Sequence, residues 1–456
     1  VTMINWLLKS AAEPVMFNGI VLQVSASIGV TFYPQQDEID AEHLQRQADQ
    51  AMYQAKQSGK NRYHVFDAEL DRSVRGHHES IERIQQALNN EEFILYYQPK
   101  VNMRSGEIIG AEALIRWQHP EQGFLTPASF LPVIEDHTLS IDVGEWVIDT
   151  TLRQIELWQG LGMNLPVSIN VSARQLQEDD FVESLRSILL KHSKVKRGFI
   201  KLEVLETSAL EDIAKVSQVI EDCAQMGVLF SLDDFGTGYS SLTYLKRLAV
   251  SELKIDQTFV RDMLDDPDDL AIIESVIGLS SAFRREVIAE GVETFEQGEM
   301  LLKLGCDFAQ GYGIAQPMPA DQLPAWAESW IVPESWSHCA KVNVEDRPLL
   351  YAMAEHRAWI EALKRNLAHL QDSPPPMDHH QCRFGVLLDQ IRQNGTVSQS
   401  RFKKIDPLHQ EVHKLASELC EMSASGNEAE ALTRMDELYV LRDELMSHLK
   451  QILAEG

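Results

Sequence analysis

The sequence lacks long apolar runs and is poor in cysteine. We find no stretch of about 18 or more consecutive apolar residues, so a membrane-spanning helix is not expected. The first residues also do not form a charged and then apolar leader. Five scattered cysteines, an odd number, argue against a disulfide framework and favour a reducing compartment. These absences predict a soluble, cytoplasmic protein.

Basic residues are also few. The chain has 41 Lys and Arg against 69 Asp and Glu, which gives a formal net charge of −28. Proteins that bind long DNA or RNA depend mainly on Lys and Arg contacts to phosphate. Anionic membrane surfaces attract basic segments for the same reason. We therefore expect neither a polymeric nucleic acid nor a membrane surface as a partner.

The remaining composition is that of an ordinary globular protein. Hydrophobic residues make up 44% and charged residues 24% of the chain, which excludes a disordered or collagen-like protein. A length of 456 residues predicts about three domains. The chain begins with Val1 rather than Met, which favours a fragment of a longer protein.

The first 90 residues have the pattern of an α/β segment followed by a helix. Val21–Tyr33 is rich in β-branched and aromatic residues, which predicts a strand. Asp40–Lys56 repeats apolar residues at spacings of three and four, which predicts a helix. Residues 68–90 are polar and helical in pattern and are expected to connect residues 1–67 to the next domain.

Residues 91–332 alternate short apolar runs with helix-length segments. Eight runs of strand length in about 240 residues predict an α/β fold, a TIM-like (β/α)8 barrel. The predicted strands lie within residues 93–101, 106–117, 165–172, 198–206, 228–236, 251–259, 286–293 and 306–313.

Each of these runs carries a polar side chain late in the run, where barrel enzymes place their chemistry. A single such residue is more often a solvated strand end, but eight runs with the same feature are hard to attribute to chance. Clustered carboxylates repel one another unless cations neutralise them, and oxygen ligands suit Mg²⁺ or Mn²⁺. The residues are Gln98, Glu112, Asn170, Glu203, Asp233, Asp234, Lys254, Glu290 and Gln310.

Such a cluster suits phosphodiester hydrolysis. Two ions about 3.5–4 Å apart can activate a water and hold the reacting phosphate oxygens. The adjacent Asp233 and Asp234 can supply one carboxylate shared between the ions and one private to the second. Lys254 would then orient or deprotonate the attacking water. Residues 235–241 (FGTGYSS) carry two glycines beside the site and can form a lid or a brace.

Residues 91–325 resemble the EAL-domain family of cyclic-di-GMP phosphodiesterases. The resemblance rests on the runs YYQPKV, EALIRW, INVSARQL, LEVLET, DDFGTGYSSL, LKIDQTFV, IAEGVET and AQGYGIAQPMP. It implies two Mg²⁺ or Mn²⁺ ions, held by Glu112, Asn170, Glu203, Asp233, Asp234 and Glu290.

The same resemblance assigns the remaining site residues. Lys254 and Gln310 would order the catalytic water or metal-bound waters, and Glu206 would hold the loop 235–241. Glu293 would be a secondary acidic residue near the site. The expected contacts to substrate come from Gln98, Leu114 and Arg116, with Arg116 facing a phosphate.

The resemblance also implies a reaction and a partner. The product would be linear pGpG, and the family often forms homodimers through this domain. The alternative is a non-catalytic cyclic-di-GMP receptor that signals through the C-terminal helices. Every expected metal and water residue is present, which argues for an active enzyme.

Residues 20–67 resemble the end of a GGDEF diguanylate cyclase domain. The matching runs are VSASIGVTFYP and ADQAMYQAKQSGKNRY, with the closing Phe66–Asp67. The signature loop of that family would lie upstream of these residues. We therefore expect no cyclase activity from residues 1–67, which would serve as a packing extension or a linker.

Residues 333–456 carry helical patterns near 342–371, 379–394, 402–424 and 427–453, which predict an antiparallel four-helix bundle. Eight of the fifteen histidines lie after residue 337. Any one histidine in a helical core is about as often an ordinary packed residue as a metal ligand. Three histidines and one cysteine on three helices nevertheless match a tetrahedral zinc site, formed by His356, Cys382, His409 and His413.

This region resembles the chemoreceptor zinc-binding (CZB) domain through EHRAW, HHQCRFG and LHQEVH. The resemblance implies that the four residues above bind Zn²⁺, with His379 and His380 as substitutes or supporting partners. The fusion of a metal site to an enzyme suggests that zinc modulates the phosphodiesterase. A third possibility is a zinc-buffering or interaction scaffold, for which Glu112→Ala would have no effect on any phenotype that depends on cyclic-di-GMP.

Overall fold

The structure is a computed structural model. It describes residues 2–17, 20–22, 24–35, 40–57, 61–237, 242–371, 373–394 and 404–455. Two compact units divide the chain, Val1–Asn90 and Glu91–Gly456, and each is considered by itself. No helix among the described residues is both long enough and apolar enough to cross a membrane.

The N-terminal unit consists of short strands and three helices. Its elements are α1 (Thr2–Ala11), β1 (Val15–Phe17), β2 (Ile20–Leu22), β3 (Ile28–Val30), α2 (Ala41–Gln57), β4 (Tyr63–Val65) and α3 (Ala68–Asn89). The helices expected at 40–56 and 68–90 are confirmed. The single strand expected at Val21–Tyr33 is wrong, because the chain changes partners within it: β2 pairs with β1, whereas β3 pairs with β4.

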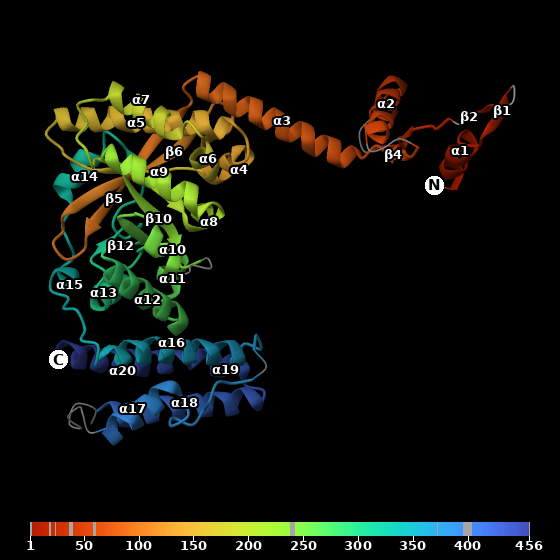
Figure 1. The fold of residues 1–456 in the computed structure, drawn as a ribbon. Helices are drawn as coiled ribbons and strands as arrows, with labels where there is room; N and C mark the ends of the chain where they lie inside the picture. Colours follow the sequence, from red (N-terminus) through yellow and green to blue (C-terminus); the bar gives the residue numbers. More distant parts are fainter. Residues whose placement is uncertain are drawn as a thin grey trace. The chain divides into compact units, whose positions relative to one another are not determined.

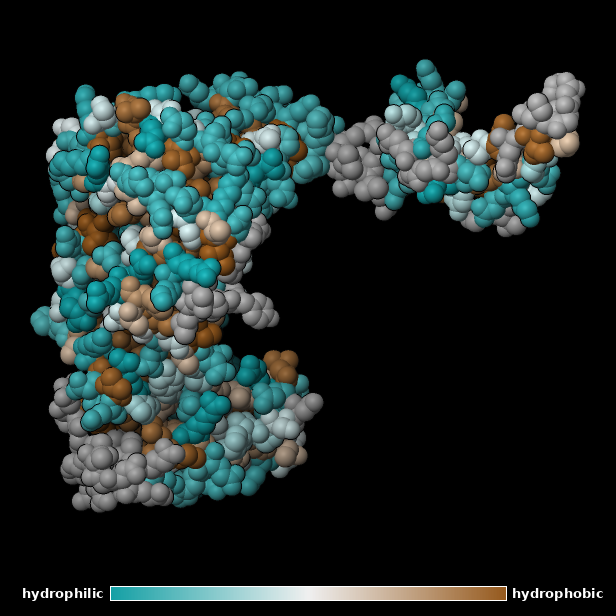
Figure 2. Space-filling model, in the orientation of Figure 1, coloured by the Kyte–Doolittle hydropathy of each residue, from teal (hydrophilic) through white to brown (hydrophobic). Residues whose placement is uncertain are grey.

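This unit leaves many large apolar side chains exposed. Trp6 is 64%, Met16 67% and Tyr33 71% exposed, and Figure 2 shows brown apolar atoms on its surface. A segment of this size buries little core. The burial agrees with the interpretation of residues 1–67 as part of a domain.

The second unit begins with a closed barrel of eight strands (Figure 1). Each predicted strand is confirmed, and the hydrogen-bonded order closes because β5 pairs with both β13 and β6. The barrel strands are β5 (Phe93–Asn102), β6 (Ile108–His119), β8 (Val167–Asn170), β9 (Ile200–Leu205), β10 (Leu229–Phe235), β11 (Glu252–Ile255), β12 (Glu286–Ala289) and β13 (Phe308–Ala309). Short strands β7 (Gly123–Leu125) and β14 (Met318–Pro319) extend the sheet.

One strand departs from the expected all-parallel barrel. β5 runs antiparallel to its two neighbours, β6 and β13. The other seven barrel strands are parallel to one another. The cause is the short connection at 103–107, which can join only antiparallel strands. Gln98 therefore reaches the site from the middle of its strand, opposite Glu112, and not from a carboxyl end.

Helices connect and surround the parallel strands. They are η1 (Pro127–Ser129), α4 (Leu131–Ile134), α5 (Leu139–Gly160), α6 (Ala173–Gln177), α7 (Phe181–Lys191), α8 (Glu206–Glu211), α9 (Ile213–Gln225), α10 (Leu242–Arg247), α11 (Gln257–Asp262), α12 (Pro267–Phe283), α13 (Phe295–Leu304), α14 (Leu323–Ser329) and α15 (Glu334–Ser337). α13 starts at a capping box formed by Thr294 and Gln297, which fixes the turn that follows β12.

The C-terminal helices form a bundle with its own apolar core. They are α16 (Arg347–Leu367), α17 (Arg383–Asn394), α18 (Ile405–Ala424), α19 (Glu428–Thr433) and α20 (Met435–Glu455). The helix expected at 342–371 starts later, at Arg347, and has a proline in its first turn. The helix expected at 427–453 is divided near Arg434, and part of the one expected at 402–424 lies outside the described residues.

The bundle contacts the barrel through α16 and α20. Glu274 on α12 accepts hydrogen bonds from Arg347 and Tyr351. Glu296 on α13 accepts bonds from Arg357 (2.6 Å) and from Lys450 (2.8 Å). α16 and α20 therefore lie on the barrel side of the bundle, and α17 and α18 lie farther from the barrel, as Figure 1 shows.

Candidate active site and metal centre

The predicted carboxylates meet at one mouth of the barrel because parallel strands bring their carboxyl ends together. Asn170 at the end of β8 stands opposite Glu203 on β9. Glu112 on β6 and Asp233 on β10 lie with Glu203 around the ammonium group of Lys254 on β11.

Lys254 lies at the centre of this ring. Its Nζ is 2.5 Å from Glu203 Oε2, 2.5 Å from Glu290 Oε1 and 3.0 Å from Asp233 Oδ1. Glu112 Oε2 is 3.6 Å away. Lys254 is 1% exposed, and the pKa of its ammonium is raised because the surrounding carboxylates outweigh burial. The group is held as a cation facing the mouth.

Amide side chains complete the ring. Gln310 donates from Nε2 to Glu112 Oε2 (2.5 Å) and to Gln98 Oε1 (3.0 Å). Asn170 donates to Glu112 Oε1 at 2.7 Å. The backbone of Gly311, the residue after Gln310, packs closely against the segment that follows β12, because an added Cβ there would lie 2.2 Å from Val292 N. The buried Gln310 Oε1 accepts no hydrogen bond from the described part of the chain and can accept one from a bound water.

The carboxylates on β10 and directly after β12 fit a divalent cation. Oxygen atoms of Asp233, Asp234 and Glu290 lie within 4.8 Å of one another. Burial raises the pKa of Glu290 well above its usual value, Lys254 opposes this, and Asp233 adds to it. Burial and a hydrogen bond with Asp256 raise the pKa of Asp234 to about 7. Burial and crowding therefore favour the protonated form of these carboxyls, and a bound divalent cation would favour the ionised form.

Two acidic or basic residues of this centre were missed from the sequence. Asp256 follows β11 and caps α11 by accepting a bond from Thr258 N at 2.7 Å. Lys100 on β5 is buried and donates to Glu203 Oε1 at 2.5 Å. Lys100 was hidden because β5 was expected to be parallel, which would place Lys100 beyond the catalytic end rather than beneath it.

A cavity of about 260 Å³ opens onto the ring. Its lining includes Leu114, Arg116 and Glu293, together with Gln98 from β5. Burial lowers the pKa of the Arg116 guanidinium, which nevertheless stays charged at neutral pH. Tyr312, which the sequence reading did not single out, also lines the cavity and is 61% exposed.

Glu206 supports the loop beside the site. Its Oε2 accepts a hydrogen bond from Gly236 N at 3.0 Å, and its side chain is buried. This contact reaches the first part of the segment predicted at 235–241. Residues 238–241 lie outside the described residues, so the rest of that segment stays a prediction.

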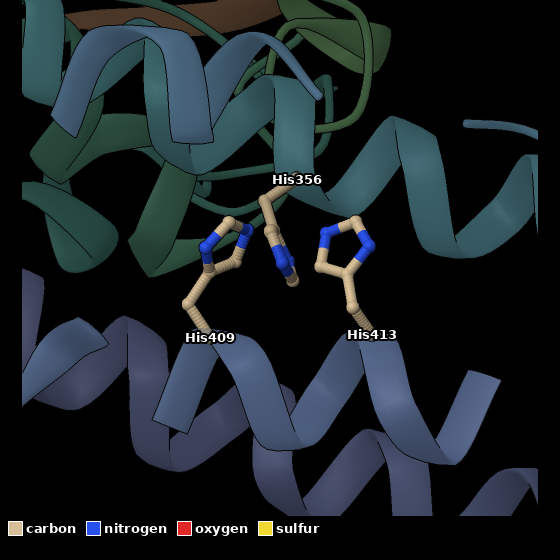
Figure 3. A group of neighbouring side chains, drawn as sticks. All are labelled: His356, His409 and His413. Carbon is tan, nitrogen blue, oxygen red and sulfur yellow. The ribbon is translucent and has the colours of Figure 1, made fainter. Parts of the chain in front are cut away.

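A second candidate metal centre lies in the bundle. His356 on α16 points toward His409 and His413, which lie one turn apart on α18 (Figure 3). One nitrogen of each imidazole lies within 4.8 Å of the others, and all three side chains are buried. Among the residues that the structure describes, no hydrogen-bond partner is found for either nitrogen of His356, for Nδ1 of His409 or for Nε2 of His413.

Cys382 lies beside this cluster but outside the compact group of three. Its Sγ is 3.2 Å from His409 Nε2 and accepts a bond from Gly385 N at 3.2 Å. Cys382 immediately precedes α17, whereas the sequence placed it inside a helix starting at 379. His379 also has a buried nitrogen without a partner, while His380 pairs with Asp389 at 2.9 Å.

The donor set fits zinc. Burial lowers the pKa of His356 to about 3 and that of His409 to about 2, so both imidazoles stay neutral, the form that binds metal. His413 donates from Nδ1 to Met377 O (2.9 Å), which leaves Nε2 as the nitrogen available to the cluster. Such a backbone contact orients a histidine ligand. A partnerless set of buried nitrogens otherwise costs stability.

Comparison with known families gives three matches along the chain. The model of the EAL domain matches residues 81–317, and that of the chemoreceptor zinc-binding domain matches residues 356–420. The model of the diguanylate cyclase GGDEF domain matches residues 1–62.

The chain is also similar to individual proteins. It is 41% identical over 325 residues to the bifunctional diguanylate cyclase/cyclic di-GMP phosphodiesterase MucR of Pseudomonas aeruginosa, covering 71% of this chain and 47% of MucR. Against the cyclic di-GMP phosphodiesterase PdeR of Escherichia coli it is 34% identical, covering 72% and 49%. The chain thus spans about half the length of these relatives.

A solved structure matches the barrel. The structure of the MucR phosphodiesterase in complex with c-di-GMP has 43% sequence identity and a TM-score of 0.52, and the match covers 54% of this chain and 99% of that one.

Proposed function

Because the chain belongs to the EAL-domain family, we propose that its barrel hydrolyses cyclic-di-GMP to linear pGpG with two divalent cations. One observation carries the proposal: four carboxylates, those of Glu112, Glu203, Asp233 and Glu290, surround the buried Lys254 beside an open cavity. The proposed ligands are Glu112, Asn170, Glu203, Asp233, Asp234 and Glu290.

The residues of the chain divide the work between binding and water activation. When bound, Mg²⁺ or Mn²⁺ would supply Lewis acidity and make water a better nucleophile. The Arg116 guanidinium, which lines the cavity, would bind a phosphate, and Gln98 and Leu114 would bound the substrate. Lys254 and Gln310 would orient the attacking water, because the ammonium donates and Gln310 Oε1 accepts.

Asp233→Asn tests the metal assignment. The amide keeps the shape of the side chain but removes a charge 3.0 Å from Lys254 Nζ, so we expect turnover to fall by roughly 100-fold or more. Product formation is measured as pGpG with Mg²⁺ or Mn²⁺, and circular dichroism checks the fold.

Asp222→Asn on the outer helix α9 is the matched control, with wild-type turnover expected. Retained activity of Asp233→Asn would refute the assignment. Binding of cyclic-di-GMP by the wild-type chain without any pGpG would instead favour a receptor.

We further propose that zinc on the histidine cluster modulates this activity. The support is that His356 neighbours Arg357 on α16, and Arg357 bonds to Glu296 on the barrel at 2.6 Å. The ligand and the barrel contact therefore sit on the same helical turn. The response of turnover to zinc removal tests the idea.

A further inference from the structure

The interior of the barrel is charged where comparable barrels are filled by Val, Ile and Leu. Residues two apart on a strand point to the same face. Lys201 and Glu203 on β9 therefore share the inner face, as do Glu252 and Lys254 on β11. Glu203, Glu252 and Lys254 are each 1% exposed, so water does not neutralise them.

These side chains form one alternating row of charges. Lys201 Nζ is 2.5 Å from Glu252 Oε2, and Glu252 Oε1 is 4.0 Å from Lys100 Nζ. Lys100 Nζ is 2.5 Å from Glu203 Oε1, and Glu203 Oε2 is 2.5 Å from Lys254 Nζ. The row runs from the inside of the barrel to the ring at its mouth.

Lys100 is the link that reaches the proposed metal ligands from below. It is 3% exposed and bonds to Ser168 Oγ at 2.8 Å as well as to Glu203. Lys100 does not line the substrate cavity. It occupies Oε1 of Glu203, so that Oε2 is the oxygen presented to the mouth.

We propose that Lys100 is a positioning residue that holds Glu203 in the orientation in which a single oxygen, Oε2, faces the catalytic cations. Without the ammonium, Glu203 would keep Lys254 as its only cationic partner and could turn both oxygens toward it. Removal of a residue that orients a metal-binding side chain typically lowers metal affinity or activity about 10- to 100-fold. For the activity readout, the inference rests on the function proposed above.

The test measures metal binding directly. The full chain carrying His409→Ala is titrated with Mn²⁺, and free Mn²⁺ is followed by electron paramagnetic resonance, so that the histidine cluster does not compete. Lys100→Met has a similar length and no charge. We expect it to weaken Mn²⁺ binding by roughly 10-fold and to lower kcat with little change in KM for cyclic-di-GMP.

Lys201→Met is the matched control, since it removes a lysine of the same row that does not touch Glu203. Wild-type Mn²⁺ affinity is expected there. An equal loss in Lys201→Met and Lys100→Met would overturn the proposal, because the row would then act only through general stability. A folded Lys100→Met chain with wild-type Mn²⁺ affinity would overturn it as well.

Ser168→Ala covers the case in which Lys100→Met does not fold. It removes one hydrogen-bond acceptor of Lys100 and leaves all charges in place, and we expect Mn²⁺ affinity to fall about 3-fold. Unchanged affinity would contradict the proposal. If the wild-type chain fails to hydrolyse cyclic-di-GMP, the proposed function fails, while the Mn²⁺ titration still decides the role of Lys100.

Discussion

At the scale of single residues, the candidate active site is held together by side chains that each serve two neighbours. Glu112 accepts from both Asn170 and Gln310. Glu203 lies between two lysines, whose charges lower its pKa despite full burial. Because buried charges are costly without partners, each member of such a network fixes the position of the next.

Glu206 offers a prediction at this scale. Glu206→Ala removes the buried acceptor of Gly236 N, and we expect turnover to fall by roughly 10-fold, since a buried hydrogen bond to a charged group stabilises by about 1.5–3 kcal/mol. Glu206→Gln keeps an acceptor oxygen and should retain most activity. Steady-state kcat of both variants checks this, and equal values for the alanine and glutamine chains would contradict the role of the hydrogen bond.

The sequence predicted those site residues that lie at the ends of recognisable strands. Asp233, Lys254 and Glu290 follow short apolar runs, so their convergence required only a closed barrel. Lys100 could not be found in this way, because its position depends on the direction of β5. Asp256 was read as part of a strand pattern and proved to cap α11.

At the scale of elements, α16 has two faces with different partners. One side buries His356 against α18, while Arg347, Tyr351 and Arg357 bond to the barrel. Apolar periodicity predicted that a helix exists here. It did not predict the barrel contacts, because polar residues on a helix surface have the same pattern whether they face solvent or a neighbour.

Glu296 offers a prediction for this contact. Burial raises the pKa of its carboxyl, but the hydrogen bonds from Arg357 and Lys450 have the larger combined effect and lower the pKa to about 2 in the folded chain. The pKa of Glu296 is lower in the folded chain than in the unfolded chain, where it is near 4.5. The ionised carboxyl therefore stabilises the fold at pH values above 4.5, and this stabilisation is lost as the pH falls toward 2. We expect Glu296→Gln to lower Tm by roughly 1–3 °C at pH 7.

The difference in Tm between the wild type and Glu296→Gln should shrink as the pH is lowered from 5 to 3. Glu299→Gln is the control on the same helix, because Glu299 pairs only loosely with Lys303, at 3.8 Å. A Tm difference for Glu296→Gln that stays constant over this range would contradict the assigned contact.

At the scale of the whole molecule, the barrel and the bundle belong to one compact unit, whereas the N-terminal residues form another. The domain boundaries at 67, 90 and 332 and the expected homodimer stay predictions. The alternation of strands and helices predicted the architecture of the barrel, because local periodicity carries that information. The contact between barrel and bundle depends on tertiary packing and could not be read from it.

Zinc modulation is the prediction at this scale. With Mg²⁺ in excess, a chelator that prefers zinc to magnesium should change the turnover of the wild-type chain by roughly 2- to 10-fold, within the usual range of coupling energies. His409→Ala should give the same turnover with and without the chelator, because it removes a central member of the cluster.

His448→Ala is the control histidine, since His448 is exposed on α20 and its Nδ1 bonds to Glu444 O at 2.9 Å, within its own helix. It should respond to the chelator as the wild type does. Equal rates for the wild type, Cys382→Ala and His409→Ala under both conditions would remove zinc from the account, while zinc content by elemental analysis would still report on binding.

The direction of β5 has a consequence for how the barrel is attached to the rest of its chain. In an all-parallel barrel, the polypeptide enters at the end opposite the catalytic groups. Here Phe93, the first residue of β5, pairs with Trp117, beyond Glu112 toward the carboxyl end of β6. The first strand of the barrel thus begins at the rim of the opening that holds the proposed site, and not at the opposite end.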